Sequence, residues 1–575
     1  MRTIGKRALG AILLGGTALA PVVSPAAAEP TLLTFGDSYT VNSRSGFPQW
    51  AKQLLDEGRI GTLHNFAQSG AYAASAIGTT TLGKSFKVQI NRWKAAGSPK
   101  AAGTVVFLGI NEITDPNVTS YSQSRSGYRS GVDALLSAGL NTEPRELLLV
   151  MPHDAGAFPR YNGVHKGTAE TRQEFRDRTE LWNSFVSKTA ADKGATAVDL
   201  FSVVDKVLTN PGAYRLSNVT RPSTAPDALF VDEIHFGRRG QEIIKQAVAS
   251  QLSATGVFGQ ALQASARTSA RQQVATTEAV RAGIAALVQD PELGLVALPL
   301  GQAEPPPEAS QFSRAFVPLG ERQDGIALAY APREGTIIGL VVSDQGVSAE
   351  GGAYRETRGA SLATRSTSLF VHQEVGALLL ETRLTHGRER HETLRFDDIT
   401  GDHDRASFGG TTLSLAQRVG RPVRGEAGGR GYVATPWAEL SHEERRVDGF
   451  TLESPFAPDQ RYAASAVGDT LASVGLDARL EPIDLGEGRR LSLWGEVSYA
   501  HGLAQDDYRV RVTEAAFGTT REETVERPAT RAVGLGLGAG LALGEGLSLD
   551  GTLALRHDLA LGTAEAGRIG LTLRF

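Results

Sequence analysis

The sequence predicts two domains of different fold class: an α/β domain with a parallel sheet, followed by an antiparallel transmembrane β-barrel. Its 575 residues are too many for one ordinary hydrophobic core. In the first half, short apolar segments are followed by longer segments with a helical pattern. In the second half, apolar and polar residues alternate with a period of two. The composition also changes midway, because Lys245 is the last lysine and Asn218 is the last asparagine.

The N-terminus has the features of a secretory signal. Arg2, Lys6 and Arg7 form a basic start, residues 8–20 are apolar and small, and residues 26–28 offer alanines for cleavage. We therefore expect residues 1–28 to be removed during export, the alternative being a buried N-terminal helix. The chain contains no cysteine, which rules out a disulfide framework in the exported protein.

The overall composition is that of a folded globular protein, with 41% hydrophobic and 21% charged residues. The formal net charge of −4 and the lack of a basic stripe argue against a nucleic-acid partner. No run of about 18 apolar residues occurs, so no transmembrane helix is predicted.

Short apolar segments in the first half are predicted to be strands of the parallel sheet: 32–35, 64–67, 104–108, 146–151 and 195–200. Longer helical patterns such as 171–193 separate them. This order predicts a sheet covered by helices on both faces. Functional residues in such sheets lie at the carboxyl ends of the strands.

The second half contains strands of about ten residues separated by polar turns. The clearest are 491–499, 533–543, 547–556 and 569–575, which ends in Phe575. This pattern is typical of an outer-membrane barrel. A soluble β-sandwich also alternates, but the signal segment and the final aromatic residue favour the membrane barrel.

A helix over about 261–289 is predicted between the halves, because residues 260–281 contain no glycine or proline. It would be about 40 Å long, which is enough to cross a bilayer. The segment is too polar to face lipid but would fit inside a polar barrel lumen, the alternative being a solvated linker helix. Three prolines at 305–307 are expected to precede the first barrel strand. The predicted divisions are therefore a signal segment (1–28), an α/β domain (29–255), a linker (256–300) and a barrel (301–575).

A candidate nucleophile, Ser38, follows the first predicted strand. Gly36 before it allows a sharp turn, and we expect a helix to start just after Ser38 and to direct its amide groups at the site. The alternative is an ordinary turn before a helix, in which Asp37 and Ser38 act only as caps.

A serine nucleophile needs a base, and the base needs an orienting carboxylate. Asp232 and His235 have a spacing at which the carboxylate can bind one ring nitrogen and leave the other for Ser38. A surface pair beside a helix N-terminus is the alternative interpretation. Other histidines compete for the role of base: His64, His153 and His165.

Hydrolysis of an ester also requires hydrogen-bond donors for the tetrahedral oxyanion. Gly70 offers a backbone amide in the turn after residues 64–67, and Asn111 offers a side-chain amide after residues 104–108. Each segment alone is a common loop sequence.

Taken together and in this order, the blocks around Ser38, Gly70, Asn111 and His235 resemble the SGNH hydrolases, also called the GDSL esterase/lipase family. The resemblance implies a flavodoxin-like three-layer fold. It also implies that Ser38 is the nucleophile, that His235 is the base and then the acid, and that Asp232 orients it. The oxyanion hole would comprise the amides of Ser38 and Gly70 and the side chain of Asn111.

The chain departs from that family at two places. Glu112 stands where the third block usually ends in aspartate, and Phe236-Gly237 follow the histidine where proline is common. Both bear on local loop shape. No Gly-x-Ser-x-Gly elbow occurs, which disfavours an α/β-hydrolase.

The second half is similar to autotransporter translocator domains. The features that carry this resemblance are the lumen helix, Pro436-Trp437, the turn 448–450 and Phe575. It implies twelve strands, surrounding outer-membrane lipid, recognition of the last strand ending in Phe575 by the barrel-assembly machinery, and a monomer with its passenger on the cell surface.

The whole arrangement resembles the autotransporter esterases, which implies a cell-surface hydrolase of ester or lipid substrates without metal or organic cofactor. The alternatives are a non-enzymatic surface adhesin, or an SGNH deacetylase or phospholipase of the same mechanism. Because no asparagine follows Asn218, self-cleavage by an asparagine inside the barrel is excluded. We expect the passenger to remain covalently attached.

Overall fold

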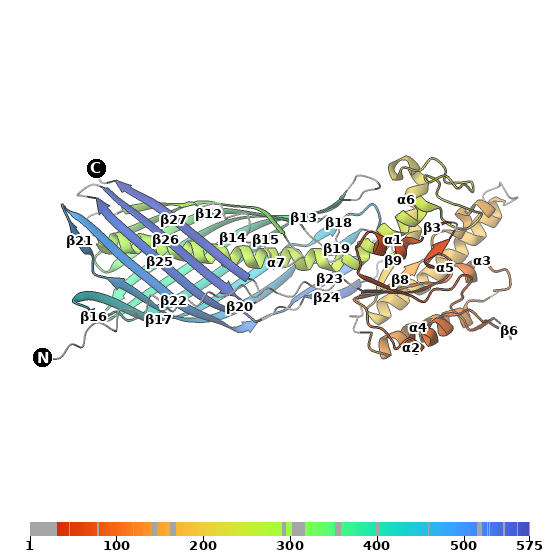
Figure 1. Cartoon of the computed structure of the whole chain (residues 1–575), viewed down its shortest axis with the longest axis horizontal. Helices are drawn as coiled ribbons and strands as arrows, with labels where there is room; N and C mark the ends of the chain where they lie inside the picture. Colours follow the sequence, from red (N-terminus) through yellow and green to blue (C-terminus); the bar gives the residue numbers. More distant parts are fainter. Residues whose placement is uncertain are drawn as a thin grey trace.

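The computed structural model shows an α/β domain at one end and a β-barrel at the other, with a long helix running from the domain into the barrel (Figure 1). The structure describes residues 31–573 except 45, 78–79, 119, 141–145, 162–167, 290–294, 302–316, 351–357, 397–398, 400–402, 458, 515–519, 526, 528, 544–546 and 560–561. The predicted signal segment, the three prolines at 305–307 and Phe575 lie outside these residues.

The α/β domain is built on a five-stranded parallel sheet, as the sequence predicts. Its strand order is β4-β1-β7-β8-β9, and every neighbouring pair is parallel. The strands are β1 (Thr31–Gly36), β4 (Thr62–Asn65), β7 (Gly103–Phe107), β8 (Leu147–Met151) and β9 (Thr196–Asp199). β1, β7 and β8 are almost entirely buried, which explains why they appear in the sequence as continuous apolar runs.

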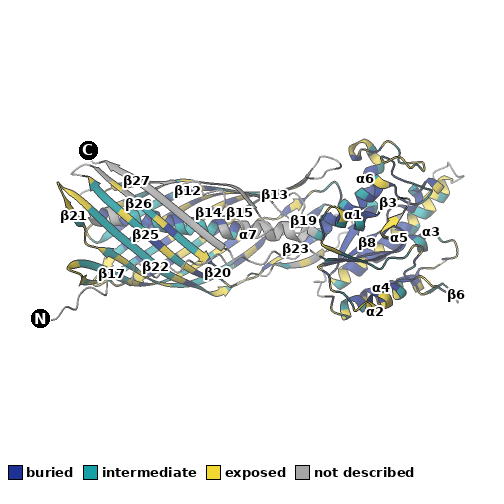
Figure 2. Ribbon diagram, in the orientation of Figure 1, coloured by how far each residue is buried: buried dark blue, intermediate teal, exposed yellow. Residues whose placement is uncertain are grey.

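Helices cover both faces of this sheet, with α1 and α6 above it and α2 and α4 below it in Figure 1. The helices of the domain are α1 (Trp50–Asp56), α2 (Phe86–Ala95), α3 (Ile110–Thr114), α4 (Ser122–Ser137), α5 (Ala169–Lys193), α6 (Leu200–Thr209) and the start of α7 (Arg238–Gln289). Trp50, Trp93 and Trp182 on three of them are fully buried. Buried residues concentrate in the centre of the domain in Figure 2. The parallel sheet with helices on both faces confirms the three-layer prediction.

The barrel is a path of twelve antiparallel strands in the described residues, and its first and last strands are in contact. They are β10 (Leu295–Gly301), β11 (Val317–Arg333), β12 (Thr336–Glu350), β13 (Arg358–Val375), β14 (Leu378–Phe396), β15 (His403–Gly420), β17 (Arg430–Val447), β20 (Ser465–Leu480), β22 (Arg489–Gln505), β25 (Arg531–Leu543), β26 (Leu547–Asp558) and β27 (Gly562–Leu573). The period-two pattern has the predicted cause: on β13, for example, Leu369 and Val371 face outward and Ser368 and Phe370 face inward.

Shorter elements complete the chain. Two strands extend the barrel at the end away from the α/β domain, two small hairpins lie in the α/β domain, and a separate four-stranded sheet lies between the two domains. They are β16 (Val423–Ala427), β21 (Ile483–Gly486), β2 (Ser43–Arg44), β3 (Phe47–Pro48), β5 (Ala76–Ile77), β6 (Thr80–Thr81), β18 (Phe450–Leu452), β19 (Gln460–Tyr462), β23 (Tyr508–Glu514) and β24 (Thr520–Val525). Short 3₁₀ turns lie at 155–157, 159–161 and 211–214.

The predicted lumen helix is continuous with the last helix of the α/β domain, and together they form α7 over residues 238–289. Polar side chains hold it inside the barrel. The Ser265 hydroxyl donates to the Glu389 carboxylate at 2.8–2.9 Å, and the Gln272 amide donates to Ser343 at 3.1 Å. The absence of glycine and proline over 260–281 therefore marks only the part of the helix inside the barrel.

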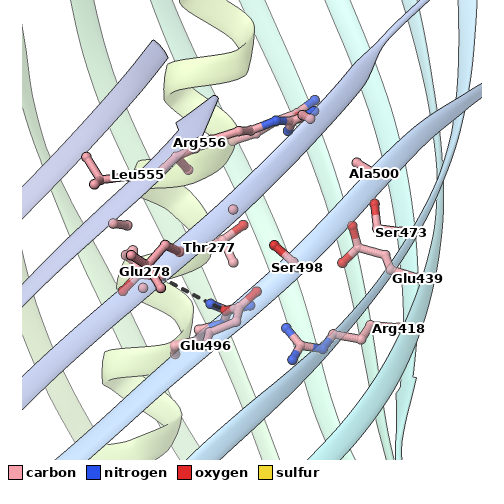
Figure 3. Close-up of a pocket in the computed structure, with 18 of the residues that line it drawn as sticks. Thr277, Glu278, Arg418, Glu439, Ser473, Glu496, Ser498, Ala500, Leu555 and Arg556 are labelled. Atoms are coloured by element: carbon pink, nitrogen blue, oxygen red, sulfur yellow. Dashed lines mark hydrogen bonds and ion pairs between the residues drawn. The ribbon is translucent and has the colours of Figure 1, made fainter. Parts of the chain in front are cut away.

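A polar cavity of about 110 Å³ lies between α7 and the strands. Figure 3 shows Glu278, Arg418, Glu439, Glu496 and Arg556 around it. Arg281 of α7 pairs with Glu278 at 3.2 Å and with Glu496 across the gap. Such a lumen suits a helix too polar for lipid.

One expectation about the linker was wrong. The first barrel strand, β10, begins at Leu295 and so precedes the three prolines, whereas the prolines were expected to precede it. The sequence already has a proline, Pro291, two residues after the last residue of α7, so the prolines at 305–307 are not needed to end the helix. Among the described helices, none combines the length and apolar character needed to cross a membrane.

Candidate active site

Ser38 lies in a tight turn at the carboxyl end of β1, the position expected for a functional residue in a parallel sheet. The helix expected just after Ser38 is not there. The amide of Thr40 donates to the carbonyl of Asp37 at 3.1 Å and closes a turn, and the first helix starts only at Trp50. No helix dipole is therefore directed at Ser38 from this segment.

Glycine is required at position 36 because there is no room for a side chain, and not because of an unusual backbone conformation. A Cβ at this position would lie 2.6 Å from the Oγ1 of Thr40 and 2.9 Å from the carbonyl oxygen of Phe107. The side chain of Gln89 also clamps this residue, since its Oε1 accepts from the Gly36 amide at 2.9 Å and its Nε2 donates to the Gly36 carbonyl at 2.8 Å. The turn that presents Ser38 is thereby fixed from both sides.

Three of the predicted site residues form one chain of hydrogen bonds. The Ser38 Oγ lies 3.0 Å from the Nε2 of His235, although 197 residues separate them. The Nδ1 of His235 lies 2.8 Å from the Oδ2 and 2.9 Å from the Oδ1 of Asp232. Ser38 is 5% and His235 7% exposed, so the pair is almost fully screened from bulk water.

The Asp232 carboxylate is held charged by its surroundings. Burial raises its pKa, but the hydrogen bond from His235 and the amides of Ile234 and His235, at 2.9 and 2.7 Å, outweigh that effect. The pKa of Asp232 therefore lies well below its ordinary value. A charged carboxylate on Nδ1 fixes the imidazole orientation that leaves Nε2 for Ser38.

Tyr39 supports the histidine from behind, a contact that the sequence did not reveal. Its ring lies 5.5 Å from the ring of His235, and its hydroxyl donates to the backbone carbonyl of Ile234. Tyr39 also packs against Phe107 and Phe236 at 5.7 Å each. Because Tyr39 is next to Ser38 in the sequence, it links the turn that carries Ser38 to the loop that carries His235.

Gly70 and Asn111 lie on neighbouring loops that are tied together. Gly70 has a φ of +76°, a left-handed conformation that favours glycine. The Nδ2 of Asn111 donates to the carbonyl of Ala71 at 2.7 Å. One N–H of the Asn111 amide thus holds the loop that carries Gly70, and a second N–H remains on the same nitrogen for a further acceptor.

Glu112, the departure noted in the sequence, is fully buried and ties the same loops together. Its Oε1 accepts a hydrogen bond from the backbone amide of Ala73, three residues beyond Gly70. Burial raises the pKa of its carboxyl to about 8, against the effect of the Ala73 amide and with a smaller contribution from the charge of Asp37. The Glu112 side chain is therefore a neutral acid over much of the physiological pH range.

Among the described residues, neither His64 nor His153 contacts Ser38, and His165 lies outside the part of the chain that the structure describes. His64 is on β4. His153 is fully buried in an aromatic cluster, with ring centroids 4.4 Å from Phe236, 5.0 Å from Phe158 and 5.4 Å from Tyr39. Burial lowers its pKa to about 3, with a smaller effect from His235. His153 is a neutral core residue behind the site.

Sequence reasoning missed Gln89 and Tyr39. Gln89 lies in α2, 53 residues from Gly36, and a glutamine in a helix carries no signal of a distant backbone partner. Tyr39 stands beside Ser38 in the sequence, but its role depends on Ile234, which is 195 residues away.

Family comparisons agree with the two halves of the fold. Residues 32–248 match the family model of the GDSL-like Lipase/Acylhydrolase, and residues 328–554 match that of the Autotransporter beta-domain. A search of curated proteins found no match.

Solved structures similar to each half exist at low identity. The translocator domain of the autotransporter NalP from Neisseria meningitidis is 17% identical and covers 54% of this chain and 100% of its own, with a TM-score of 0.36. An acetyl xylan esterase, AlAXEase, is 16% identical over 38% of this chain and 98% of its own, with a TM-score of 0.28. Phospholipase A1 from Streptomyces albidoflavus NA297 is 16% identical over 39% and 100%, with a TM-score of 0.26. On the two family matches, the chain combines a GDSL-type hydrolase domain with an autotransporter β-domain, and so is an outer-membrane protein whose hydrolase passenger is exported to the cell surface.

Proposed function

We propose that the passenger is a carboxylic ester hydrolase in which Ser38, His235 and Asp232 act as a catalytic triad. The observation that carries this proposal is the continuous set of hydrogen bonds from Ser38 Oγ to His235 Nε2 and from His235 Nδ1 to Asp232. A serine nucleophile needs a base within hydrogen-bond distance and a group that orients the base. The family match over residues 32–248 supports hydrolysis as the class of reaction.

In the first half of the reaction, His235 removes the proton of the Ser38 hydroxyl as the oxygen attacks the ester carbonyl carbon. The carbonyl π-electrons move to oxygen and give a tetrahedral oxyanion. When this intermediate collapses, the bond to the alcohol oxygen breaks, and the protonated His235 gives its proton to the leaving alcohol. Asp232 stays charged throughout and stabilises the imidazolium.

In the second half, water enters where the alcohol left. His235 removes a proton from this water, which attacks the acyl carbon bound to Ser38. Collapse releases the acid and returns the proton to the serine oxygen. Every proton is carried by His235, so the proposed reaction needs no cofactor beyond these side chains.

The oxyanion would be stabilised by the amides of Ser38 and Gly70 and by the Asn111 side chain. Gly70 and Asn111 are held together through Ala71, and this preorganised arrangement is what makes such donors effective. In the proposed enzyme, the passenger remains covalently attached to the barrel, since no asparagine is present in or after α7 to cleave it.

The decisive experiment replaces the nucleophile. Ser38→Ala should lower turnover of a chromogenic short-chain ester on whole cells by at least about 10⁴-fold, because the acyl-enzyme can no longer form. Ser120→Ala, which changes an exposed serine of the same domain, is the matched control and should retain full activity. Surface exposure of both variants is checked with an antibody to the passenger. Retained hydrolysis in Ser38→Ala would disprove the proposed mechanism. If the protein is instead a non-enzymatic adhesin, the unmodified protein should hydrolyse no ester.

A further inference from the structure

The last helix of the hydrolase domain determines which way the active site faces. α7 begins at Arg238, three residues after His235, and continues into the barrel lumen. In a parallel α/β sheet, each helix returns in the direction opposite to the strands, so α7 starts at the carboxyl edge of the sheet and ends beyond the amino edge. Ser38 and His235 lie at the carboxyl edge. The barrel must therefore lie on the opposite side of the sheet from the active site.

The number of residues along α7 gives the distance from the active-site end of the domain to the barrel. The helix rises about 1.5 Å per residue, so Gln251 lies about 20 Å beyond Arg238, and Ser265 lies about 20 Å beyond Gln251. Ser265 is already inside the barrel, where it donates to Glu389. Figure 1 agrees, since α3, which contains Asn111, lies at the end of the domain away from the barrel.

The domain is also held in this orientation by a hairpin between the barrel strands β17 and β20, here called the clamp hairpin, which comprises β18, residues 453–457 and β19. Phe456 at its tip is 1% exposed and belongs to the hydrophobic core of the hydrolase domain. Its ring lies edge-on to Tyr214 at 5.6 Å. A residue of the barrel thus completes the core of the passenger.

Polar contacts flank this apolar contact. The Tyr214 hydroxyl donates to the carbonyl of Pro455 at 3.0 Å, and Lys206 Nζ donates to the carbonyls of Ser454 and Ala457 at 3.0 and 3.1 Å. The Nε2 of Gln460 donates to the Oε1 of Gln251 at 2.9 Å, and both side chains are at least 96% buried. Lys206 and Tyr214 lie at and beyond the C-terminal end of α6, on the amino-edge side of the sheet, so the clamp grips the side opposite to Ser38.

We propose that the clamp hairpin and α7 together hold the hydrolase with its active site turned away from the outer membrane, so that it acts on esters arriving from outside the cell and not on lipids of its own membrane. This inference rests on the proposed ester hydrolase activity. The headgroup region extends only about 5–8 Å beyond the hydrocarbon core. A lipid ester in the same membrane therefore cannot reach a serine about 20 Å beyond the clamp.

The orientation can be measured without any activity. Because the chain has no cysteine, a single introduced cysteine carries a dye at one known place. Asn117→Cys, just after α3, and Ala213→Cys, beside Tyr214, are both at exposed positions. In vesicles holding the full-length protein, a lipid-linked energy acceptor should quench the dye at 213 at least twofold more than the dye at 117. Equal quenching, or stronger quenching at 117, would overturn the proposed orientation.

The predicted preference for soluble substrates is tested by offering the same ester in solution and attached to a membrane lipid. A butyryl ester of a fluorophore is supplied either free in solution or attached to a phospholipid headgroup in the same vesicles as the protein. The unmodified protein should hydrolyse the free ester and should cleave the lipid-linked ester no faster than Ser38→Ala. A variant called the released variant combines two changes that free the hydrolase domain from the barrel. Phe456→Asp disrupts the contact of the clamp hairpin, and about 20 Gly/Ser residues inserted after Leu252 form a flexible linker that spans roughly 25 Å.

The released variant should cleave the lipid-linked ester at least fivefold faster than the unmodified protein, with its rate on the free ester within twofold. Comparable hydrolysis of both esters by the unmodified protein would refute the inference while leaving the ester hydrolase proposal standing. Failure of the unmodified protein on the free ester would refute the ester hydrolase itself. No gain in the released variant, with its free-ester activity intact, would show that orientation does not exclude membrane lipids.

Discussion

The ring of Tyr39 lies 5.5 Å from the ring of His235, and the Tyr39 hydroxyl is hydrogen-bonded to the carbonyl of the residue just before that histidine. Tyr39 is also the residue next to Ser38. A single side chain thus spans the two loops whose relative position sets the 3.0 Å separation between Ser38 Oγ and His235 Nε2.

Tyr39→Phe should keep the ring contacts and lose only the hydrogen bond to Ile234. Because the imidazole would then be less firmly placed, we expect kcat on a soluble short-chain ester to fall about tenfold with little change in KM, corresponding to about 1.4 kcal/mol. Tyr39→Leu, which also removes the ring contacts with His235, Phe107 and Phe236, should lower kcat further. A phenylalanine variant with unchanged kcat would show that packing alone positions His235.

If the proposed oxyanion role holds, Asn111→Ala should lower kcat on the order of 10²-fold, as loss of one oxyanion donor does in serine hydrolases. The loop of Gly70 would also lose its bond from Asn111 to Ala71. Asn111→Asp serves as the comparison, since it keeps the size of the side chain but removes its donors. The kcat of both variants and of the unmodified protein is measured by steady-state kinetics on one ester. Equal kcat values in Asn111→Asp and the unmodified protein would contradict the proposed role of Asn111 as an oxyanion donor.

Glu112→Gln should change how stability depends on pH. The pKa of the buried Glu112 carboxyl is raised to about 8, compared with an ordinary value of 4.5, so the folded state binds more protons than the unfolded chain in that window. The free energy of unfolding therefore falls as pH rises from about 4.5 to 8, by up to about 1.4 kcal/mol per pH unit.

Glutamine keeps the acceptor for the Ala73 amide and cannot ionise. Urea denaturation of the full-length protein in detergent, followed by tryptophan fluorescence, should show that the variant lacks this fall and gains stability relative to the unmodified protein towards pH 8. If the free energy of unfolding depended on pH in the same way in both proteins, the proposed effect of the buried Glu112 carboxyl would be contradicted.

His153→Phe should act at the acid end. Burial lowers the pKa of His153 to about 3 from an ordinary 6.5, so the unfolded chain binds more protons than the folded protein between these values. Stability contributed by the neutral ring is present above about pH 6.5 and is lost as pH falls towards 3.

Phenylalanine fits the same aromatic cluster and removes the titration. The variant should therefore retain more of its neutral-pH stability at pH 4 than the unmodified protein, measured by the same denaturation series. His64→Gln on β4 is the control and should leave the acid loss of stability in place. The prediction is wrong if His153→Phe and the control respond alike to acid.

Much of the fold follows from local patterns. The apolar run 104–108 is typical of a strand buried on both faces, and the alternation on segments such as 491–499 is typical of a strand with one apolar face and one polar face. The order of the blocks around Ser38, Gly70, Asn111 and His235 likewise identified candidate residues before any coordinates. Local sequence failed for the helix expected after Ser38, where a turn closed by Asp37 and Thr40 prevails.

The sequence by itself determined the two fold classes, the polar helix in the lumen and the candidate catalytic residues, because these depend on periodicity and on residue types at fixed spacing. Only the tertiary structure decided what surrounds them: the Gln89 clamp on Gly36, the Tyr39 support of His235, and Phe456 of the barrel buried in the hydrolase core. The reason is that these contacts join segments 53 to 242 residues apart, between Gly36 and Gln89 at the near end and between Tyr214 and Phe456 at the far end. Their partners are chosen by how whole elements pack, which no short stretch of sequence encodes.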